Sequence, residues 1–241
     1  MEHFIIIRFS TIFNNRPELK TTHIFDSDRL DFRFNLFSKY TLPSLVNQSL
    51  ITFKIIIIYD KNLPTQYFDT LFHLTKDYDF IILHQWNIND NLVNNDWFLQ
   101  YITNKNPDSY IITTRIDDDD MIHKNLNKKM ISHIKKFYCK DSIITFSGAH
   151  FLKYINDNDM SIRKINYKSL SVFQTKIAKL SDINIYGHSH DNIKISHKII
   201  KFNNAFVQFN HIYENDNRFQ RFFNKTYTPI SYTQLLSLLN L

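Results

Sequence analysis

The chain of 241 residues has little cysteine and no long apolar run. Its single cysteine, Cys139, excludes an internal disulfide framework and a cysteine-rich zinc site, so nothing requires an oxidising compartment. No apolar stretch approaches the roughly eighteen residues of a membrane span, and the opening Phe4-Ile5-Ile6-Ile7 is cut short by Arg8. We therefore expect a soluble, cytoplasmic protein with no secretory signal and no transmembrane segment.

Positive charge is in excess, but it forms no long unbroken run in the sequence. The 29 Lys and Arg against 23 Asp and Glu give a net charge of +6, and no run of about five or six like positive charges occurs. This balance suits the phosphates of a nucleotide as well as it suits nucleic acid. A basic nucleic-acid-binding domain is an alternative, but no recognisable binding motif supports it, so no nucleic-acid partner is expected.

Glycine is also scarce, with only two residues, whereas Ile, Asn, Lys, Phe and Tyr are abundant. This pattern indicates a compositional bias, so single Asn and Lys residues carry little information. Within that background, Ile-rich runs of strand length alternate with segments of helical spacing. We expect strands over residues 4–9, 53–59, 80–83, 110–116 and 143–146, and helices over 30–50, 65–76 and 96–103.

The alternation predicts an α/β fold with a mostly parallel sheet and helices on both faces. After about residue 150 the pattern loosens into a smaller mixed β region. There residues 151–155 and 161–165 flank the turn-rich residues 156–159, which predicts a hairpin, and residues 232–241 predict a packing helix. We expect a single domain over residues 1–241, because no linker is visible.

Four consecutive aspartates, residues 117–120, directly follow the expected strand 110–116 and precede a helix-like segment that begins at Met121. Clustered carboxylates in a cleft repel one another and need a compensating charge. Mg²⁺ or Mn²⁺ supplies it, since these ions accept carboxylate ligands and complete their shell with water and substrate phosphates. Capping of the following helix accounts for one or two aspartates but not for four. The run therefore predicts a metal site.

The spacing within the run suggests which aspartates act together. Where the backbone is extended, alternate residues share a face, so Asp117 and Asp119 would point together while Asp118 and Asp120 point away. This arrangement is a D-x-D motif.

Other charged residues fall at the ends of expected strands, where open α/β sheets bind ligands. Asp60 closes the run 54–59, and Asp117 closes the run 110–116. Arg8 and Arg115 lie near strand ends, where an arginine can bind phosphate. Each residue alone is more typical of a solvated loop, but their joint placement at one edge favours a binding site.

Segments spread over most of the chain resemble the rhamnosyltransferase family of bacterial glycosyltransferases, which have a GT-A-like fold. The most specific is Ile112-Thr113-Thr114-Arg115-Ile116-Asp117-Asp118-Asp119-Asp120, which is similar to the family's Thr-Arg-Leu-Asp-x-Asp-Asp block. The other matching segments are residues 3–9, Arg33 with the Pro-Ser-x-x-x-Gln signature of residues 43–48, the strand 53–60, and the aromatic-x-Gln-x-x-His-x-x-x-Asn segment of residues 206–215.

The resemblance implies transfer of a sugar from a nucleotide-sugar donor whose diphosphate is bridged by Mn²⁺ or Mg²⁺. By this similarity Asp119 is the best metal ligand, Asp117 contacts the metal or the donor ribose, and Asp60 lies by the nucleotide base. His211 is a candidate third ligand or diphosphate contact, although a half-buried structural histidine fits its position equally well. Residues 1–120 would form the nucleotide-binding half and residues 121–241 the acceptor-side half.

An inverting transfer also needs a base for the acceptor hydroxyl. The polar segment 187–191 supplies His188, His190 and Asp191, and we favour Asp191, although a surface turn also accounts for this segment. The spacing His188-x-His190 alone is a weak zinc signal, since no cysteine lies nearby. The acceptor, whether glycan, lipid or protein, is not fixed by the sequence.

A second class of enzyme also uses clustered aspartates, because metal-dependent phosphoryl transferases and nucleases hold two metals with carboxylates. Such sites usually draw carboxylates from several strands, and the rest of this chain gives little sign of them.

Overall fold

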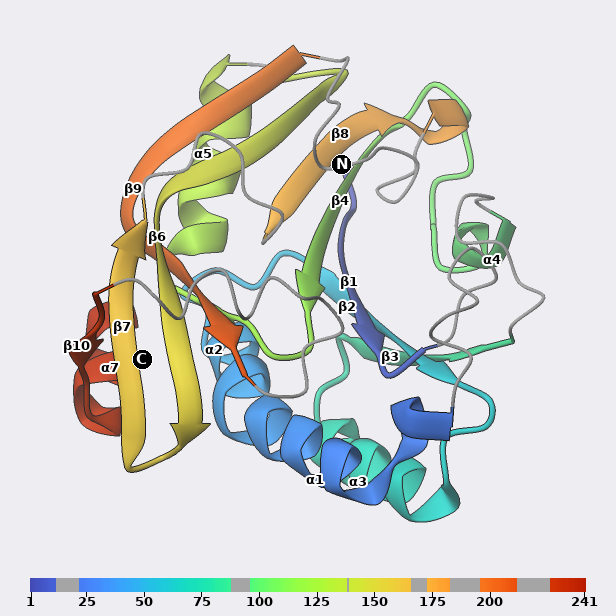
Figure 1. Ribbon diagram of the computed structural model, residues 1–241. Helices are drawn as coiled ribbons and strands as arrows, with labels where there is room; N and C mark the ends of the chain where they lie inside the picture. The colour runs from blue at the N-terminus through green and yellow to red at the C-terminus, as the bar shows by residue number, and fades with distance from the viewer. Residues whose placement is uncertain (12–21, 88–95, 138, 166–172, 183–195, 212–225) are drawn as a thin grey trace.

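The computed structural model describes residues 1–11, 22–87, 96–137, 139–165, 173–182, 196–211 and 226–241 (Figure 1). The described strands are β1 His3–Phe9, β2 Lys54–Asp60, β3 Ile81–Trp86, β4 Tyr110–Asp117, β5 Met121–Ile122, β6 Ser142–Asn156, β7 Asp159–Ile165, β8 Gln174–Lys179, β9 Ser196–Asn210 and β10 Thr228–Pro229. The described helices are α1 Ser27–Leu36, the π-helical η3 Phe37–Thr41, α2 Leu42–Val46, α3 Thr65–Thr75, α4 Asp96–Leu99, α5 Leu126–Phe137 and α7 Tyr232–Leu239, with the short 3-10 turns η2 Thr22–Phe25 and η4 Leu180–Asp182.

The centre of the sheet is parallel, as the Ile-rich runs predict. β1 lies between β2 and β4 and is parallel to both, and β3 extends the parallel part beyond β2. Phe9, Asp60 and Asp117 are the last residues of β1, β2 and β4, so the carboxyl ends of these strands meet at one edge. That edge holds the candidate site.

Helices cover both faces of the parallel strands, which confirms the predicted fold class (Figure 1). Alternate strand residues face opposite ways, so Ile5 and Ile7 pack in the core beneath α1, α2, α3 and α5, while Phe4 and Ile6 pack on the side of α4. None of the helices in the described part of the chain combines the length and apolar character that a membrane span requires.

A mixed β region continues the same sheet through the C-terminal half. β8 is antiparallel to both β4 and β6 and so joins the two parts. β6 and β7 form the hairpin predicted at residues 156–159, and β9 runs parallel to β6. The strand register shifts at Gly148, whose φ is +86° and where an added Cβ would lie 2.3 Å from the carbonyl oxygen of Phe202. This position of the bulge therefore requires glycine.

The π-helical η3, which directly follows α1, is held against the hairpin by a carboxylate. Asp157 accepts hydrogen bonds from the hydroxyls of Tyr40 at 2.6 Å and Tyr154 at 2.9 Å, and it pairs with Lys39. Burial and the hydrogen bond to Asp157 raise the pKa of Tyr154 to about 12. The Tyr154 hydroxyl is therefore protonated at neutral pH and donates to Asp157. The contact fixes α1 and η3 relative to β6 and β7.

Two sequence expectations differ from the structure. The helix expected from Met121 is wrong, because Met121 and Ile122 form β5 and pair with Val207 and Phe206 of β9; the helix begins at Leu126. Helical spacing cannot separate two buried strand residues from the first turn of the helix that follows them. The helix expected over residues 96–103 ends at Leu99.

Burial of a neutral histidine in β1 predicts a pH-dependent stability. His3 is 3% exposed, its Nε2 lies 2.9 Å from Thr114 Oγ1, and burial lowers its pKa from 6.5 to about 3. Below pH 6.5, His3 therefore takes up a proton in the unfolded chain but stays neutral in the folded chain. The free energy of unfolding falls with falling pH by up to about 1.4 kcal/mol per unit from this residue alone.

We expect His3→Gln to remove this contribution. Between about pH 6.5 and about pH 5 the variant should lose about 1.5 kcal/mol less stability than the wild type in urea unfolding. His73→Gln, at an exposed position on α3, is the control and should leave the pH dependence unchanged. An identical pH dependence in the His3 variant would contradict the assignment.

Candidate functional site

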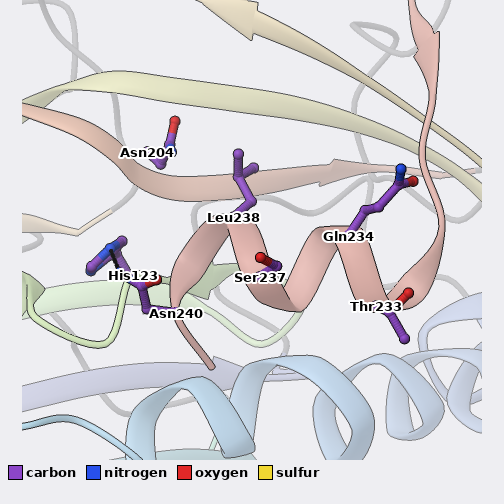
Figure 2. Close-up of a pocket in the computed structure, with 7 residues that line it drawn as sticks. All are labelled: His123, Asn204, Thr233, Gln234, Ser237, Leu238 and Asn240. Carbon is purple, nitrogen blue, oxygen red and sulfur yellow. Dashed lines mark hydrogen bonds between the residues drawn. The ribbon is translucent and has the colours of Figure 1, made fainter.

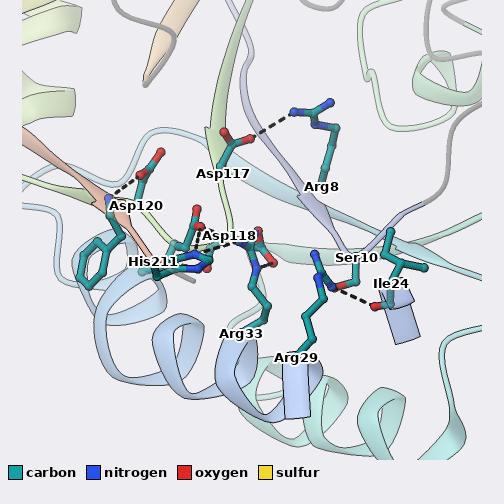
Figure 3. A network of polar contacts seen from close by, with 12 residues as sticks. Arg8, Ser10, Ile24, Arg29, Arg33, Asp117, Asp118, Asp120 and His211 are labelled. Carbon is teal, nitrogen blue, oxygen red and sulfur yellow. Dashed lines mark hydrogen bonds and ion pairs between the residues drawn. The ribbon is translucent and has the colours of Figure 1, made fainter. Parts of the chain in front are cut away.

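The four aspartates lie where β4 leaves the sheet. The backbone turns after Asp117, and the amide of Asp120 donates to the carbonyl of Asp117 at 3.3 Å. This turn ends the extended conformation, so the alternation of faces expected for Asp117–Asp120 does not hold. The four side chains instead have three different sets of partners, and Figure 3 shows Asp117, Asp118 and Asp120 pointing in different directions.

Asp117 pairs with β1. It lies opposite Arg8 in the strand register, and Nη2 of Arg8 lies 3.3 Å from its Oδ1. The pair is half-exposed, with 35% of the Arg8 side chain and 47% of the Asp117 side chain accessible. Water screens such a pair, so it contributes little to stability, and both side chains are partly exposed to solvent.

Asp118 points inward and is buried, with 1% of its side chain exposed. Arg33 of α1 binds it through two nitrogens, Nη2 to Oδ1 and Nε to Oδ2, the latter at 3.2 Å. The backbone carbonyl of Asp118 also accepts the hydroxyl of Thr41 at 3.0 Å. This two-pronged geometry is the strongest arrangement for an arginine and a carboxylate, and it fixes α1 to the aspartate turn.

Asp119 shares the same arginine and adds a histidine. Its Oδ2 accepts Nη1 of Arg33 at 2.5 Å and lies 2.8 Å from Nε2 of His211, the residue directly after β9. The two partners come from opposite ends of the chain, since His211 lies 92 residues beyond Asp119. Tertiary structure therefore assembles the carboxylate of Asp119 with an imidazole and a guanidinium at one point, and Figure 3 labels His211 and Arg33 there.

The charges of this cluster are strongly interdependent. Burial raises the pKa of Asp118 to about 6 against the opposing effect of Arg33. Burial acts the same way on Asp119, but Arg33 and His211 outweigh it and lower the pKa to about 2. Burial alone would lower the pKa of Arg33, yet the two carboxylates raise it well above its ordinary value. Arg33 is therefore permanently charged and Asp119 is ionised.

His211 is neutral in this arrangement. It is fully buried and contacts the ring of Phe32 at 4.9 Å between centroids. Burial lowers its pKa, and the nearby Arg33 adds to the effect, although Asp119 opposes both. Asp119, an acceptor, lies 2.8 Å from Nε2, closer than the donor Nη1 of Arg33 at 3.3 Å, so we assign the imidazole proton to Nε2, which donates to Asp119. Nδ1 is then the unprotonated nitrogen.

Asp120 has a structural role. It is 1% exposed, and its Oδ1 accepts the backbone amide of Phe209 in β9 at 3.3 Å. The contact ties the end of the aspartate run to the strand that carries His211. Asp120 is therefore directed toward β9 by the turn and by this hydrogen bond, not by alternation along an extended strand.

The remaining predicted residues either lie along the same edge of the sheet or fall outside the residues that the structure describes. Arg115 is buried two residues before Asp117 in β4, and Asp60 ends β2, where its Oδ1 accepts the amide of Asn62 at 2.9 Å. Asp191, predicted as the base, lies outside the described residues, as do His188 and His190.

Sequence reasoning missed the two arginines of α1 as site residues. Arg29 is buried and donates to Ser10 Oγ at 3.2 Å and to the carbonyl of Ile24 at 2.9 Å, and burial lowers its pKa to about 10. Arg29 and Arg33 are one helical turn apart and so share the face that meets the sheet edge. That spacing, in a helix rich in apolar residues, is the signal that could have identified them.

The donors near Asp119 fit part of a metal site. Among the residues that the structure describes, no group of three or more His, Cys, Asp or Glu side chains is arranged to hold a metal. Two donors do fit, because Oδ2 of Asp119 and Nε2 of His211 are 2.8 Å apart and neighbouring ligands of an octahedral Mg²⁺ are about 3 Å apart. Mg²⁺ sites commonly combine one or two protein ligands with water and phosphate oxygens.

A separate pocket of about 450 Å³ lies between α7 and β9 (Figure 2). Its polar groups serve the fold: Gln234 forms a capping box with Ser231, and Asn240 Nδ2 lies 3.0 Å from His123 Nε2. Asn204 completes the rim. The pocket shares no residue with the aspartate cluster. Its polar side chains are present because they cap α7 and join Asn240 to His123.

Comparison with known proteins places the chain in a family. The model of the family described as "Putative rhamnosyl transferase" matches residues 3–221. The chain belongs to this family. The resemblance recognised in the sequence is therefore confirmed over most of the chain, from β1 to beyond His211. A search of curated proteins finds no match.

Solved structures similar to this family member include S. aureus TarS. TarS 1-349 is 11% identical over 87% of this chain and 61% of that chain, with a TM-score of 0.49. Its complex with UDP-GlcNAc is 10% identical over 99% of this chain and 64% of that chain, with the same TM-score. A longer TarS structure is covered over 37% of its length at a TM-score of 0.45. The chain spans less than two thirds of these proteins.

The buried cluster predicts a large effect on stability at Arg33. Arg33→Ala leaves the carboxylates of Asp118 and Asp119 buried without their cation, which should lower the free energy of unfolding by about 3–5 kcal/mol in urea titrations. Adding Asp118→Asn to this variant should restore part of the loss, because it removes one of the two unpaired charges.

The control is Lys76→Ala, which deletes one exposed positive charge at the end of α3 and should change stability by less than about 0.5 kcal/mol. A loss below about 1 kcal/mol in Arg33→Ala would show that the buried ion pairs do not hold the turn in place.

Proposed function

We propose that this protein is a nucleotide-sugar-dependent glycosyltransferase that binds the donor diphosphate and Mn²⁺ or Mg²⁺ beside Asp119 and His211. The observation that carries the proposal is the 2.8 Å approach of Asp119 Oδ2 and His211 Nε2 at the carboxyl edge of the parallel strands. Membership of a glycosyltransferase family supports the reaction class. Ligands of open α/β sheets bind at this edge.

The chemistry of the transfer explains why these residue types are needed. Breaking the bond between sugar and diphosphate leaves negative charge on the nucleotide, and a bound divalent cation supplies Lewis-acid stabilisation of that charge. Asp119 and His211 are the residues that would hold the cation. His211 would bind through Nε2, so its proton must move to Nδ1, which is unprotonated in the arrangement described above.

Arg33 positions the site. Its guanidinium binds both oxygens of Asp118 and one oxygen of Asp119, so it fixes the direction in which Asp119 points. It also neutralises part of the negative charge before any ligand arrives. Arg29, the second buried arginine of α1, also acts on both carboxylates, so the inner cluster is balanced in charge before a ligand binds.

The half-exposed pair of Arg8 and Asp117 lies at the same edge and is suited to the polar parts of the donor. We propose that Arg8 and Arg115 contact its phosphates, that Asp117 contacts the ribose or the metal, and that Asp60 lies by the base. Residues 1–120 then form the nucleotide-binding half and residues 121–241 the acceptor-side half of one domain.

The second substrate needs a base. An inverting transfer requires a group that accepts the proton of the acceptor hydroxyl, and we propose Asp191 for this role. The acceptor class is not part of the proposal.

A thermal-shift screen tests donor binding. Purified protein is heated with uridine, guanosine and thymidine diphosphate sugars, each with and without Mn²⁺. At about 100 times its Kd, one donor class should add about 2.7 kcal/mol of stability in the presence of the metal. Asp119→Asn and His211→Ala should each abolish this metal-dependent gain, because each removes one ligand of the cation.

The matched control is Asp69→Asn, which removes an exposed carboxylate from α3 and should keep the full gain. Metal-dependent donor stabilisation that survives Asp119→Asn would refute the assigned ligand. Stabilisation by metal alone, with hydrolysis of phosphodiesters and no response to any donor, would favour the phosphoryl-transferase alternative.

A further inference from the structure

The segment that contains α5 concentrates positive charge. Residues 121–140 contain six lysines and no acidic residue, and all six lysines are exposed. They belong to α5 and its flanking residues. The lysines are Lys124, Lys128, Lys129, Lys135, Lys136 and Lys140.

The packing of α5 decides which way these side chains point. Leu126, Met130 and Ile134 form its buried stripe and pack into the main core, and Met130 Sδ accepts a hydrogen bond from Thr175 of β8 at 3.1 Å. The four lysines of the helix itself lie outside this stripe on its solvent-facing side, since all of them are exposed: Lys128, Lys129, Lys135 and Lys136.

A strand far along the chain adds to this charge. Lys198 of β9 is exposed, and it acts electrostatically on His133 together with Lys129 and Lys136. Burial and these three lysines lower the pKa of His133, so this imidazole is neutral at pH 7. Lys129, Lys136 and Lys198 thus lie around one imidazole, and we call the exposed lysines of residues 121–140 together with Lys198 the basic face.

The basic face is uncompensated within the described chain. None of the six lysines of residues 121–140 forms an ion pair with a described residue, and the nearest acidic residue in sequence, Asp141, accepts a hydrogen bond from Tyr110. Maintaining like charges side by side without a counter-charge destabilises the chain slightly. A ligand of opposite charge would relieve this repulsion.

An aromatic side chain ends the basic face. Phe137, the last residue of α5, is 57% exposed. Its ring lies 4.6 Å from that of His133, and Lys136 Nζ lies 5.3 Å from its centre. An exposed apolar ring set among lysines is suited to a partner with negative charge at its surface and an apolar interior.

We propose that the basic face of α5 and β9 docks this protein reversibly on an anionic phospholipid bilayer. Lysines near an anionic leaflet each contribute to attraction, and an aromatic residue at the edge enters the interfacial layer. The face favours lipid over nucleic acid because it is built from lysines without arginines, and lacks the forked donors that recognise nucleic acid. The inference is independent of the proposed function.

Sedimentation with vesicles tests the proposal. The full chain is mixed with vesicles of pure phosphatidylcholine or with about 30% phosphatidylglycerol, at about 0.1 M and about 0.5 M NaCl. We expect binding to the anionic vesicles at the lower salt, loss of that binding at the higher salt, and no binding to neutral vesicles.

A matched pair of triple variants locates the binding surface. Lys129→Glu/Lys136→Glu/Phe137→Ser should weaken partitioning at least about tenfold. The control Lys61→Glu/Lys76→Glu/Phe72→Ser makes the same changes at exposed positions on and near α3 and should bind within about twofold of wild type. Thermal melts of both variants verify that they are folded.

Three outcomes would overturn the proposal. These are no sedimentation of wild type with anionic vesicles, equal losses in both triple variants, and equal binding to neutral vesicles. A single-stranded oligonucleotide is titrated in parallel. Salt-sensitive binding to it that the basic-face variant loses, without vesicle binding, would assign the surface to nucleic acid and reject the membrane.

Discussion

The guanidinium of Arg33 is the group on which the candidate site depends. Asp118 and Asp119 are adjacent and buried, and two such carboxylates repel strongly where water is excluded. Arg33 compensates both, with two contacts to Asp118 and one to Asp119. Because the arginine is on α1 and the aspartates follow β4, the same ion pairs join a helix to the sheet edge.

Several contacts hold α1 where Arg33 can make these bonds. Phe34 of α1 packs in the main core, and Tyr40 of the π-helical turn binds Asp157 of the hairpin. His211 is fixed in turn by β9, which Asp120 holds through the amide of Phe209. The site is therefore assembled from a helix, a turn and a late strand, each fixed by its own packing. Preorganisation of this kind keeps charged groups in position before a ligand binds.

Much of the fold could be predicted from local sequence. Ile55 to Ile58 are buried on both faces of a central strand, and continuous apolar runs of this length are typical of parallel sheets. The hairpin at residues 156–159 followed from its turn residues. The strand at Met121 could not be predicted, since its reason is pairing with Val207 far along the chain. The roles of the individual aspartates also depended on a turn that extended-strand geometry does not anticipate.

The sequence by itself determined the class of the fold, the edge where the candidate site lies and the family, because periodicity and short motifs are local properties of the chain. Only the tertiary structure decided that Asp118 binds Arg33, that Asp119 meets His211, and that Lys198 joins the lysines of α5. These are encounters between segments far apart in sequence. The energies of these contacts depend on how deeply the charged groups are buried and how far apart they lie. Both quantities are set only when the chain has folded with its strands in register.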